Sequence, residues 1–225
     1  MSDPAPSAKF DAYARSYQEL HKSSVAASGE DPAYFHDYKI DCLARRGLLG
    51  GPVLDYGCGT GNLTERLARR SDEVHGYDPS AESLAEAKER APGAAFHADP
   101  ASLPAGHFAV AVLSGVLHHV PPKERAEVLR TVRRALRPGG RVVVFEHNPL
   151  NPVTRRAVAA CPFDDDAILL WPWEARGLLR RGGFSDVELD FIVFFPRPLA
   201  FLRPLEPRLR RVALGAQQML VGRRD

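Results

Sequence analysis

The chain has 225 residues, 44% of them hydrophobic and 26% charged, with a formal net charge of +2. A chain of this length buries a substantial core without disulfides or metals, and its composition is that of an ordinary globular protein. The small net charge, with basic and acidic residues alternating, argues against nucleic-acid binding. Three widely spaced cysteines predict neither a zinc site nor a disulfide framework.

The amino-terminal end is polar and rich in alanine and proline. Residues 1–8 hold no basic segment followed by an apolar one, so they predict a disordered tail rather than a signal peptide or anchor. No run approaches the roughly 20 apolar residues that a membrane span needs. We therefore expect a cytoplasmic protein without a membrane-spanning segment.

Residues 9–50 show a helical pattern in two pieces that separate at Ser28-Gly29. The second piece opens on Asp31-Pro32, a capping side chain followed by proline at the first helical position, and it ends at Gly47. Aromatic residues are concentrated here. We expect an N-terminal helical lid over residues 9–50, followed by a core at residues 51–225, within one domain overall.

From residue 51 onward, strand and helix patterns alternate. Strands are expected at residues 53–56, 73–77, 94–98, 107–113 and 141–145, and helices at residues 62–70, 80–90 and 124–136. Asn62 and Glu65 are spaced as a capping box. A helix at 173–181 and strands at 186–195 and 217–221 complete the pattern, whereas the proline- and arginine-rich residues 197–212 predict no regular element. Strands separated by helices imply βαβ units and a parallel sheet, so the fold class is α/β.

A glycine-rich turn, Asp55-Tyr56-Gly57-Cys58-Gly59-Thr60-Gly61, closes the first strand. Glycine permits close approach of the backbone to a ligand and backbone angles that other residues resist. The dinucleotide fingerprint GxGxxG requires a third glycine where this chain has Asn62. Asp55, two residues before the first glycine, would also repel a pyrophosphate. The spacing therefore disfavours dinucleotide binding.

The segment from Val53 to Gly61, an acid followed by GxGxG, resembles motif I of the class I S-adenosylmethionine-dependent methyltransferases. The resemblance implies a doubly wound, Rossmann-like, mostly parallel seven-stranded sheet with helices on both faces and an antiparallel last strand. It implies S-adenosylmethionine as the cofactor. Gly57 and Gly59 would cradle its methionine half, and Asp55 would serve its charged amino end.

The same resemblance assigns cofactor contacts after the next strands. Asp78, followed by Pro79, matches the acid that accepts from the ribose hydroxyls, and Asp99, followed by Pro100, resembles the acid that receives the adenine amino group. Ser114, after the fourth strand, would face the sulfonium centre. Taken singly, either aspartate fits a helix cap or a surface position equally well.

Phe10-Asp11-Ala12-Tyr13-Ala14-Arg15-Ser16-Tyr17 resembles the FDxxAxxY helix that folds over the cofactor in many small-molecule methyltransferases. Tyr17 matches the tyrosine that contacts the cofactor there. The alternative is that these aromatic residues only pack a helix against the sheet.

His118 is the candidate general base, because imidazole titrates near neutrality and the segment 114–121 should face the reacting centre. The alternative is a structural His-His pair, and His119 fits that alternative better. Glu146-His147-Asn148 together with Asp164-Asp165-Asp166 offer metal-ligand side chains, but their spacing matches no magnesium-dependent methyltransferase. We therefore expect no metal.

The predicted function is methyl transfer to an oxygen, nitrogen or carbon atom of a small-molecule, natural-product-like acceptor. Arginine outnumbers lysine 25 to 5, which fits a GC-rich bacterial source and a biosynthetic role. One alternative is a lipid-linked or glycan acceptor, since residues 198–212 combine arginine with Phe201, Leu202, Leu205 and Leu209. The other is a cofactor-bound protein with non-methylating chemistry. The sequence predicts no oligomeric state.

Overall fold

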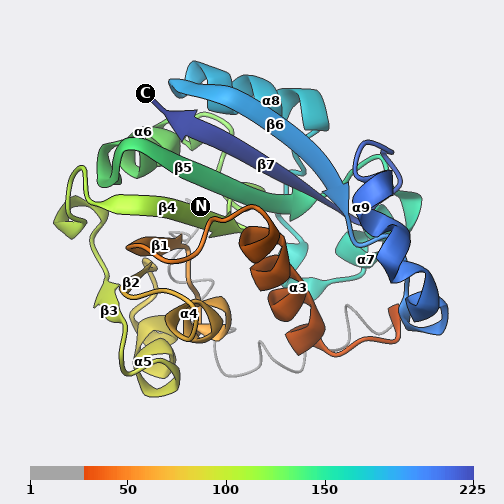
Figure 1. The fold of residues 1–225 in the computed structure, drawn as a ribbon, viewed down its shortest axis with the longest axis horizontal. Helices are drawn as coiled ribbons and strands as arrows, with labels where there is room; N and C mark the ends of the chain where they lie inside the picture. Colours follow the sequence, from red (N-terminus) through yellow and green to blue (C-terminus); the bar gives the residue numbers. More distant parts are fainter. Residues whose placement is uncertain (1–27) are drawn as a thin grey trace, which may run out of the picture.

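The computed structural model describes residues 28–225, and within this range the strands form one seven-stranded sheet (Figure 1). The strands are β1 (Val53–Tyr56), β2 (Val74–Tyr77), β3 (Ala95–His97), β4 (Phe108–Ser114), β5 (Leu136–His147), β6 (Phe184–Ile192) and β7 (Gln217–Arg224). Their order is β3-β2-β1-β4-β5-β7-β6. β1 to β5 pair in parallel, and β7 is antiparallel to both β5 and β6. The predicted fold class is confirmed.

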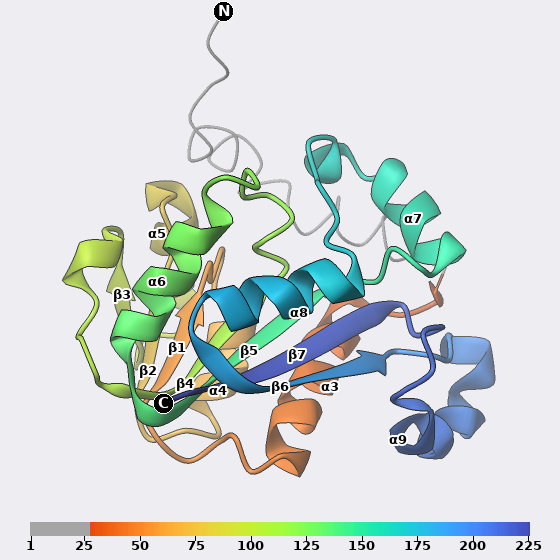
Figure 2. The same cartoon turned by 90° about the horizontal axis from the view of Figure 1, so that it is seen from above.

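Helices and 3-10 turns connect and cover these strands. They are α3 (Pro32–Arg45), α4 (Asn62–Ala68), α5 (Ala81–Arg90), η3 (Pro100–Ser102), α6 (Arg125–Ala135), α7 (Pro152–Ala159), η4 (Pro162–Asp164), α8 (Pro172–Arg181), η5 (Arg197–Leu205) and α9 (Glu206–Leu209). Figure 2 shows α6 and α8 on one side of the sheet and α3 and α4 on the other.

The side chains of each strand divide between these two faces, as the alternation of a β-strand requires. Leu54 packs in the cluster that contains Leu129 of α6 and Leu179 of α8. Val53, its neighbour in the chain, packs in the cluster that contains Leu43 of α3. All four residues of β1 are buried, which is the pattern of a central strand covered on both faces.

The strand order reverses between β1 and β4. The chain runs from β1 outward to β2 and β3, then returns to place β4 on the other side of β1. The loops after β1 and β4 therefore diverge at the carboxyl ends of adjacent parallel strands. In open α/β sheets this switch point leaves a crevice for ligands.

The helix predicted after Asp31-Pro32 is confirmed as α3, with the Asp31 side chain accepting from the backbone N–H of Ala33 at 2.9 Å. The capping box predicted for α4 is wrong. Gly61 precedes the helix with φ of +79°, and the Asn62 side chain donates instead to Thr60 Oγ1 at 3.0 Å. The tight turn needs a left-handed residue at position 61, which moves Asn62 into the first helical position.

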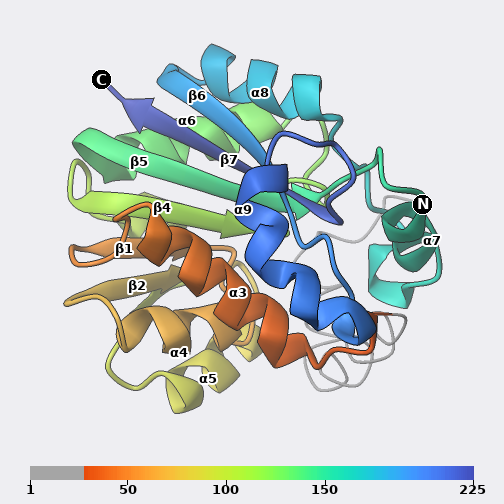
Figure 3. The same ribbon diagram turned by 45° about the vertical axis from the view of Figure 1, so that its right-hand side comes forward.

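Two regions differ from the sequence prediction. α7, with Asn151 as its N-cap, lies where no helix was expected. The proline-rich stretch folds into η5 and α9, and these lie beside α3 (Figures 1 and 3). Tyr38 of α3 donates a short hydrogen bond to Glu206 of α9, which explains that proximity. Tyr38 and Glu206 are 168 residues apart in the chain, so no local sequence pattern predicts this contact.

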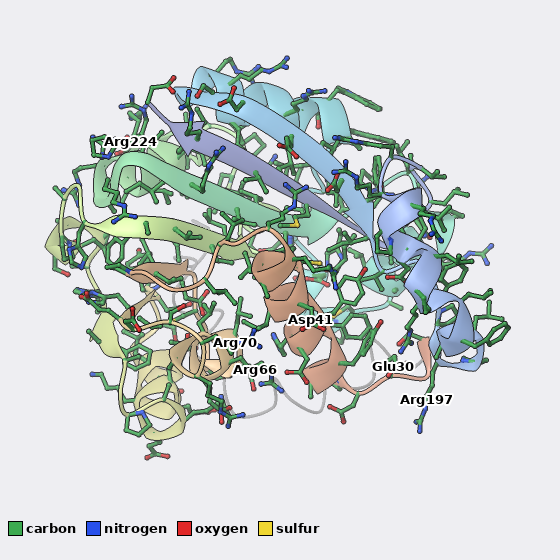
Figure 4. The ribbon with its side chains drawn as sticks, viewed as in Figure 1. Glu30, Asp41, Arg66, Arg70, Arg197 and Arg224 are labelled. Carbon is green, nitrogen blue, oxygen red and sulfur yellow. The ribbon has the colours of Figure 1, made fainter. Side chains whose placement is uncertain are left out.

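α3 belongs to the core of its face, with Ile40, Cys42 and Leu43 buried against the sheet. Arg66 of α4 reaches toward it (Figure 4), and Arg66 Nε lies 2.5 Å from Asp37 Oδ1. The predicted first helical piece, including Tyr13 and Tyr17, lies outside the described residues. Among the described helices, none combines the length and the apolar character that crossing a bilayer would take.

Candidate active site

A cleft of about 960 Å³ opens where the parallel strands end. Its walls come from the loops that follow β1, β2, β4 and β5, from α3 and α7, and from residues 193–196. One half is formed by the glycine turn and the residues after β2. The other half is formed by residues that end or follow β4 and β5 and by residues 193–196. The cleft therefore lies at the switch point of the sheet.

The glycine turn forms the floor of the first half. Gly57, Gly59 and Gly61 all have positive φ, at +78°, +52° and +79°. A Cβ on Gly57 would meet Val116 Cγ2 at 2.5 Å, and one on Gly61 would meet the Ala87 Cα at 2.9 Å. A Cβ on Gly59 would meet nothing within 4 Å. Gly57 and Gly61 are thus required for packing, whereas Gly59 keeps open a space that a ligand can fill.

Asp78 links the turn after β2 to the glycine turn. Its Oδ2 accepts from the Gly59 backbone N–H at 2.8 Å, and its Oδ1 accepts from the Ser80 backbone N–H at 2.9 Å. These two bonds hold the Asp78 carboxylate between the two turns that line the cleft.

Asp99 differs from Asp78 in its surroundings. Its side chain is exposed, its Oδ1 caps η3 by accepting from the Ala101 backbone N–H at 2.8 Å, and it is not among the residues that line the cleft. The neighbouring Pro100 does line the cleft, as does Pro79 after Asp78.

Asp55 is buried at the end of β1, where its Oδ2 accepts from the Thr64 hydroxyl at 2.7 Å. Burial, together with the nearby Asp78, raises the pKa of Asp55 to about 6 against the opposing effects of Thr64 and Lys39. A positively charged ligand group beside Asp55 would stabilise the ionised carboxylate, which burial disfavours.

Lys39 enters the site from α3, and the sequence analysis missed it. Its Nζ donates to Ser114 Oγ at 2.8 Å and lies 5.8 Å from the centre of the Phe145 ring. Burial lowers the pKa of Lys39 to about 8, while Glu146 and Asp55 act in the opposite direction. Its spacing with the buried Phe35 and Leu43, at i±4, was the available signal, because it puts a lysine on the buried face of the helix.

His118 is 3% exposed and lies between two carboxylates. Its Nδ1 donates to Glu146 Oε2 at 2.5 Å, and its Nε2 lies 3.6 Å from Asp164 Oδ1. Burial alone would lower the pKa of His118, but Glu146 and Asp164 outweigh it and raise the pKa to about 9. Glu146 is itself oriented by the Leu117 backbone N–H, which donates to Oε1 at 2.8 Å.

His119 contacts the same aspartate from the other side. Its Nε2 lies 3.4 Å from Asp164 Oδ1 and its Nδ1 lies 3.5 Å from Asp166 Oδ1. Burial and the neighbouring His118 lower the pKa of His119 to about 4. Asp164 comes from η4, so the loops after β4 and β5 meet around one carboxylate.

The structure thus gathers most of the side chains that the sequence singled out. The predicted site residues that line the cleft are Asp55, Gly57, Gly59, Asp78, Pro79, Pro100, Ser114 and His118. Asp99 lies outside the lining, and Tyr17 lies outside the described residues.

Residues 53–140 match the family model of a methyltransferase domain. The chain is 35% identical over 152 residues to a ubiquinone biosynthesis O-methyltransferase of Sodalis glossinidius, covering 62% of this chain and 57% of that protein. It is 40% identical over 136 residues to a trans-aconitate 2-methyltransferase of Methylobacterium nodulans, covering 55% of this chain and 50% of that protein. The match therefore spans little more than half the length of these two curated relatives.

Solved structures share the fold. A crystal structure of an S-adenosylmethionine-dependent methyltransferase from Thermotoga maritima superposes with a TM-score of 0.69, at 17% identity, covering 98% of this chain and 100% of that chain. At this identity the likeness supports the fold alone.

Proposed function

We propose that this chain, a member of the class I S-adenosylmethionine-dependent methyltransferase family, transfers a methyl group to an oxygen, nitrogen or carbon atom of a small-molecule acceptor. The family match over residues 53–140 confirms the resemblance drawn from the glycine turn. The observation that carries the proposal is the open space at Gly59, in a cleft that Asp55 and Asp78 also line at the switch point of the sheet.

The residues of the first half fit the cofactor by their chemistry. Gly59 leaves room for its methionine part, Gly57 shapes the same turn, and the buried Asp55 offers a carboxylate to a charged amino group. Asp78 and Pro79 would hold the ribose, and Pro100 with Asp99 would border the adenine. Ser114 would face the sulfur, and Tyr17 would cover the cofactor.

When bound, S-adenosylmethionine supplies a methyl group already activated on a sulfonium. The chain therefore has to hold the acceptor in line and keep water out. Aromatic side chains border the second half of the cleft, namely Tyr34, Phe35, Phe194 and Phe195. They favour an acceptor with an apolar or aromatic body, and both curated relatives are named for methylating small molecules.

His118 is the proposed base for an acceptor that must lose a proton, in a site that holds no metal ion. Its Nδ1 is held by Glu146, so Nε2 is the atom that accepts a proton once His118 is neutral, and the raised pKa of about 9 makes that neutral form prevail only at alkaline pH. A carboxylate on the far nitrogen of an imidazole fixes the tautomer and stabilises the imidazolium. Glu146 is thus a positioning residue for His118.

A second candidate is methylation of a lipid-linked or glycan acceptor. Phe201 of η5 is 74% exposed, and Leu205 and Leu214 nearby in the chain are also exposed. Arginines flank them, a composition suited to an anionic lipid surface. Sedimentation with vesicles of anionic phospholipid tests this candidate, and a protein that stays in the supernatant excludes it.

The leading proposal is tested by incubating the protein with methyl-labelled S-adenosylmethionine and a panel of phenolic, carboxylic and amine acceptors. We expect labelled product and S-adenosylhomocysteine with one acceptor class, and neither with Asp78→Ala. If bound cofactor is never turned over with any acceptor, the protein performs non-methylating chemistry instead, and the proposal fails.

A further inference from the structure

His118, His119 and Asp164 each direct one potential metal-ligand atom toward the same point in the cleft. Asp164 Oδ1 lies 3.6 Å from His118 Nε2 and 3.4 Å from His119 Nε2. The three ligand atoms all lie within 4.8 Å of one another. All three residues line the cleft, on the acceptor side.

These separations suit a single metal ion. Imidazole nitrogens and carboxylate oxygens bind Zn²⁺ at about 2.1 Å, so two ligands at a tetrahedral angle lie about 3.4 Å apart. The carboxylate-to-imidazole distances in the cluster are close to this value, yet too long for good hydrogen bonds.

The far side of the His118 imidazole is arranged as in metal sites, and that of His119 faces a carboxylate at a longer distance. His118 turns Nδ1 to Glu146 at 2.5 Å, and His119 turns Nδ1 to Asp166 at 3.5 Å. A metal-bound histidine typically donates its other N–H to a carboxylate or carbonyl, which fixes the ring and exposes the correct nitrogen. Both rings therefore point Nε2 at Asp164 with a carboxylate behind them.

Asp164 supplies an independent observation. Its side chain is 5% exposed, and its buried Oδ1 accepts no hydrogen bond from the described part of the chain. A buried carboxylate oxygen without a donor is costly unless it is paired or binds a metal. Glu146 and Asp164 together bring two negative charges into the interior, and a divalent cation balances them while both imidazoles stay neutral.

We propose that His118, His119 and Asp164 bind one divalent transition-metal ion of the Zn²⁺, Mn²⁺ or Fe²⁺ class, with the remaining coordination positions open to the cleft. This differs from the sequence prediction that no metal is bound. Two histidines and one carboxylate with open positions form a set that such ions accept. From the sequence alone, Asp164 is considered as a metal ligand together with Glu146 and His147. In the fold, Asp164 lies instead against His118 and His119, which follow β4.

The open positions give the ion a role toward the acceptor, and this role rests on the proposed function. A divalent ion binds an oxygen of the acceptor and lowers the pKa of a hydroxyl there. Because Nε2 of His118 is then occupied as a ligand, the hydroxyl proton passes to solvent water in the open cleft and the ion holds the resulting oxyanion. The site therefore favours an oxygen acceptor.

The test uses the full chain, stripped with a chelator and titrated with Co²⁺ alone. Calorimetry gives the stoichiometry, and visible absorption reports the ligand field. The variants His119→Ala and Asp164→Asn each remove one ligand and leave the His118–Glu146 pair in place. The control is His107→Ala, because Glu73, His75 and His107 form the other His/carboxylate group of comparable spacing in the described residues.

We expect wild type and the control to bind one equivalent of Co²⁺ with the same spectrum. The two ligand variants should bind at least about tenfold more weakly, by analogy with the losses seen even for residues that only orient a ligand. Melting temperatures of all four proteins show whether each variant is folded. Absence of Co²⁺ binding by wild type, or unchanged binding by both folded ligand variants, overturns the proposal.

A titration of the same samples with S-adenosylhomocysteine separates this proposal from the proposed function. Binding of S-adenosylhomocysteine without Co²⁺ binding overturns the metal site and leaves the methyltransferase proposal standing. Co²⁺ binding that depends on His119 and Asp164, without binding of S-adenosylhomocysteine, supports the metal site and removes the cofactor assignment.

Discussion

Gly59 donates its backbone N–H to Asp78 Oδ2 across 2.8 Å, which ties the turn after β1 to the turn after β2. The carboxylate proposed to bind the ribose thus also holds the glycine turn proposed to bind the methionine half. Because the two turns share one hydrogen bond, the two ends of the cofactor site are positioned together. We therefore expect substitutions in the glycine turn to disturb both ends of the proposed cofactor site.

The glycines of this turn should separate binding from stability. Gly59→Ala adds a methyl group to open space in the cleft, so we expect at least a tenfold loss of S-adenosylhomocysteine affinity. Its φ of +52° adds a backbone cost of about 1 kcal/mol. Gly61→Ala adds a methyl group 2.9 Å from the Ala87 Cα, so its main cost should be about 2 kcal/mol or more in the free energy of unfolding.

Calorimetry for binding and urea denaturation for stability check this pair. If Gly59→Ala binds as tightly as wild type, the space beside Gly59 does not hold the cofactor. If Gly61→Ala is as stable as wild type, the close packing of α4 against α5 is not as described.

Asp55 should make the protein less stable as the pH rises through the acid range. Its pKa is about 6 in the folded chain against about 3.9 when unfolded. Between these values the folded state binds more protons, so the free energy of unfolding falls with rising pH, by about 3 kcal/mol in total. Above about pH 6 the free energy of unfolding has fallen by the full amount, and below about pH 4 it has not fallen.

Asp55→Asn removes this titration and keeps an acceptor for the Thr64 hydroxyl. The stability of the variant relative to wild type should therefore increase from pH 4 to pH 6 and then stay constant. Denaturation at five pH values between 4 and 7.5 measures the difference. A stability difference between the variant and wild type that does not change with pH would mean that the pKa of Asp55 is not raised in the folded chain.

Tyr38 and Tyr34 offer a matched pair on α3. The Tyr38 hydroxyl donates to Glu206, which also accepts from the Phe194 and Phe195 backbone N–H groups at 3.0 and 3.1 Å. The Tyr34 hydroxyl is buried without a hydrogen-bond partner among the described residues. Tyr38→Phe should cost about 1–2 kcal/mol, and Tyr34→Phe should cost nothing or stabilise slightly.

Thermal and urea denaturation of the two variants check this expectation. Equal losses from both substitutions would show that the bond between Tyr38 and Glu206 does not hold α9 against α3.

The strands were accessible from the sequence because each leaves a local pattern, whereas the doubly wound sheet was implied by the family resemblance. β1 is a short apolar run before a glycine turn, and α6 has a clear amphipathic repeat. α7 was missed although Asn151-Pro152 is a capping signal, because its eight residues make little more than two helical turns. The capping box at Asn62 failed because the conformation of Gly61 overrides a side-chain spacing.

The site was predicted only where its residues follow strands. Asp55 and Ser114 lie at the ends of β1 and β4, and Asp78 follows β2 directly, so the topology brings them together. Lys39 was missed because its hydrogen bond to Ser114 joins residues 75 apart in the chain. The joining of His118 to Asp164 likewise depends on how the loops after β4 and β5 fold toward each other.

The central claim is that the cleft binds S-adenosylmethionine through the glycine turn and Asp78. Calorimetric titration of S-adenosylhomocysteine into wild type, Asp78→Ala and the exposed control Asp72→Ala tests it most directly. The account predicts one site in wild type and in the control, and at least about tenfold weaker binding in a folded Asp78→Ala, since hydrogen bonds to a charged group contribute about 1.5–3 kcal/mol. No binding by wild type, or equal affinity in Asp78→Ala, would contradict it.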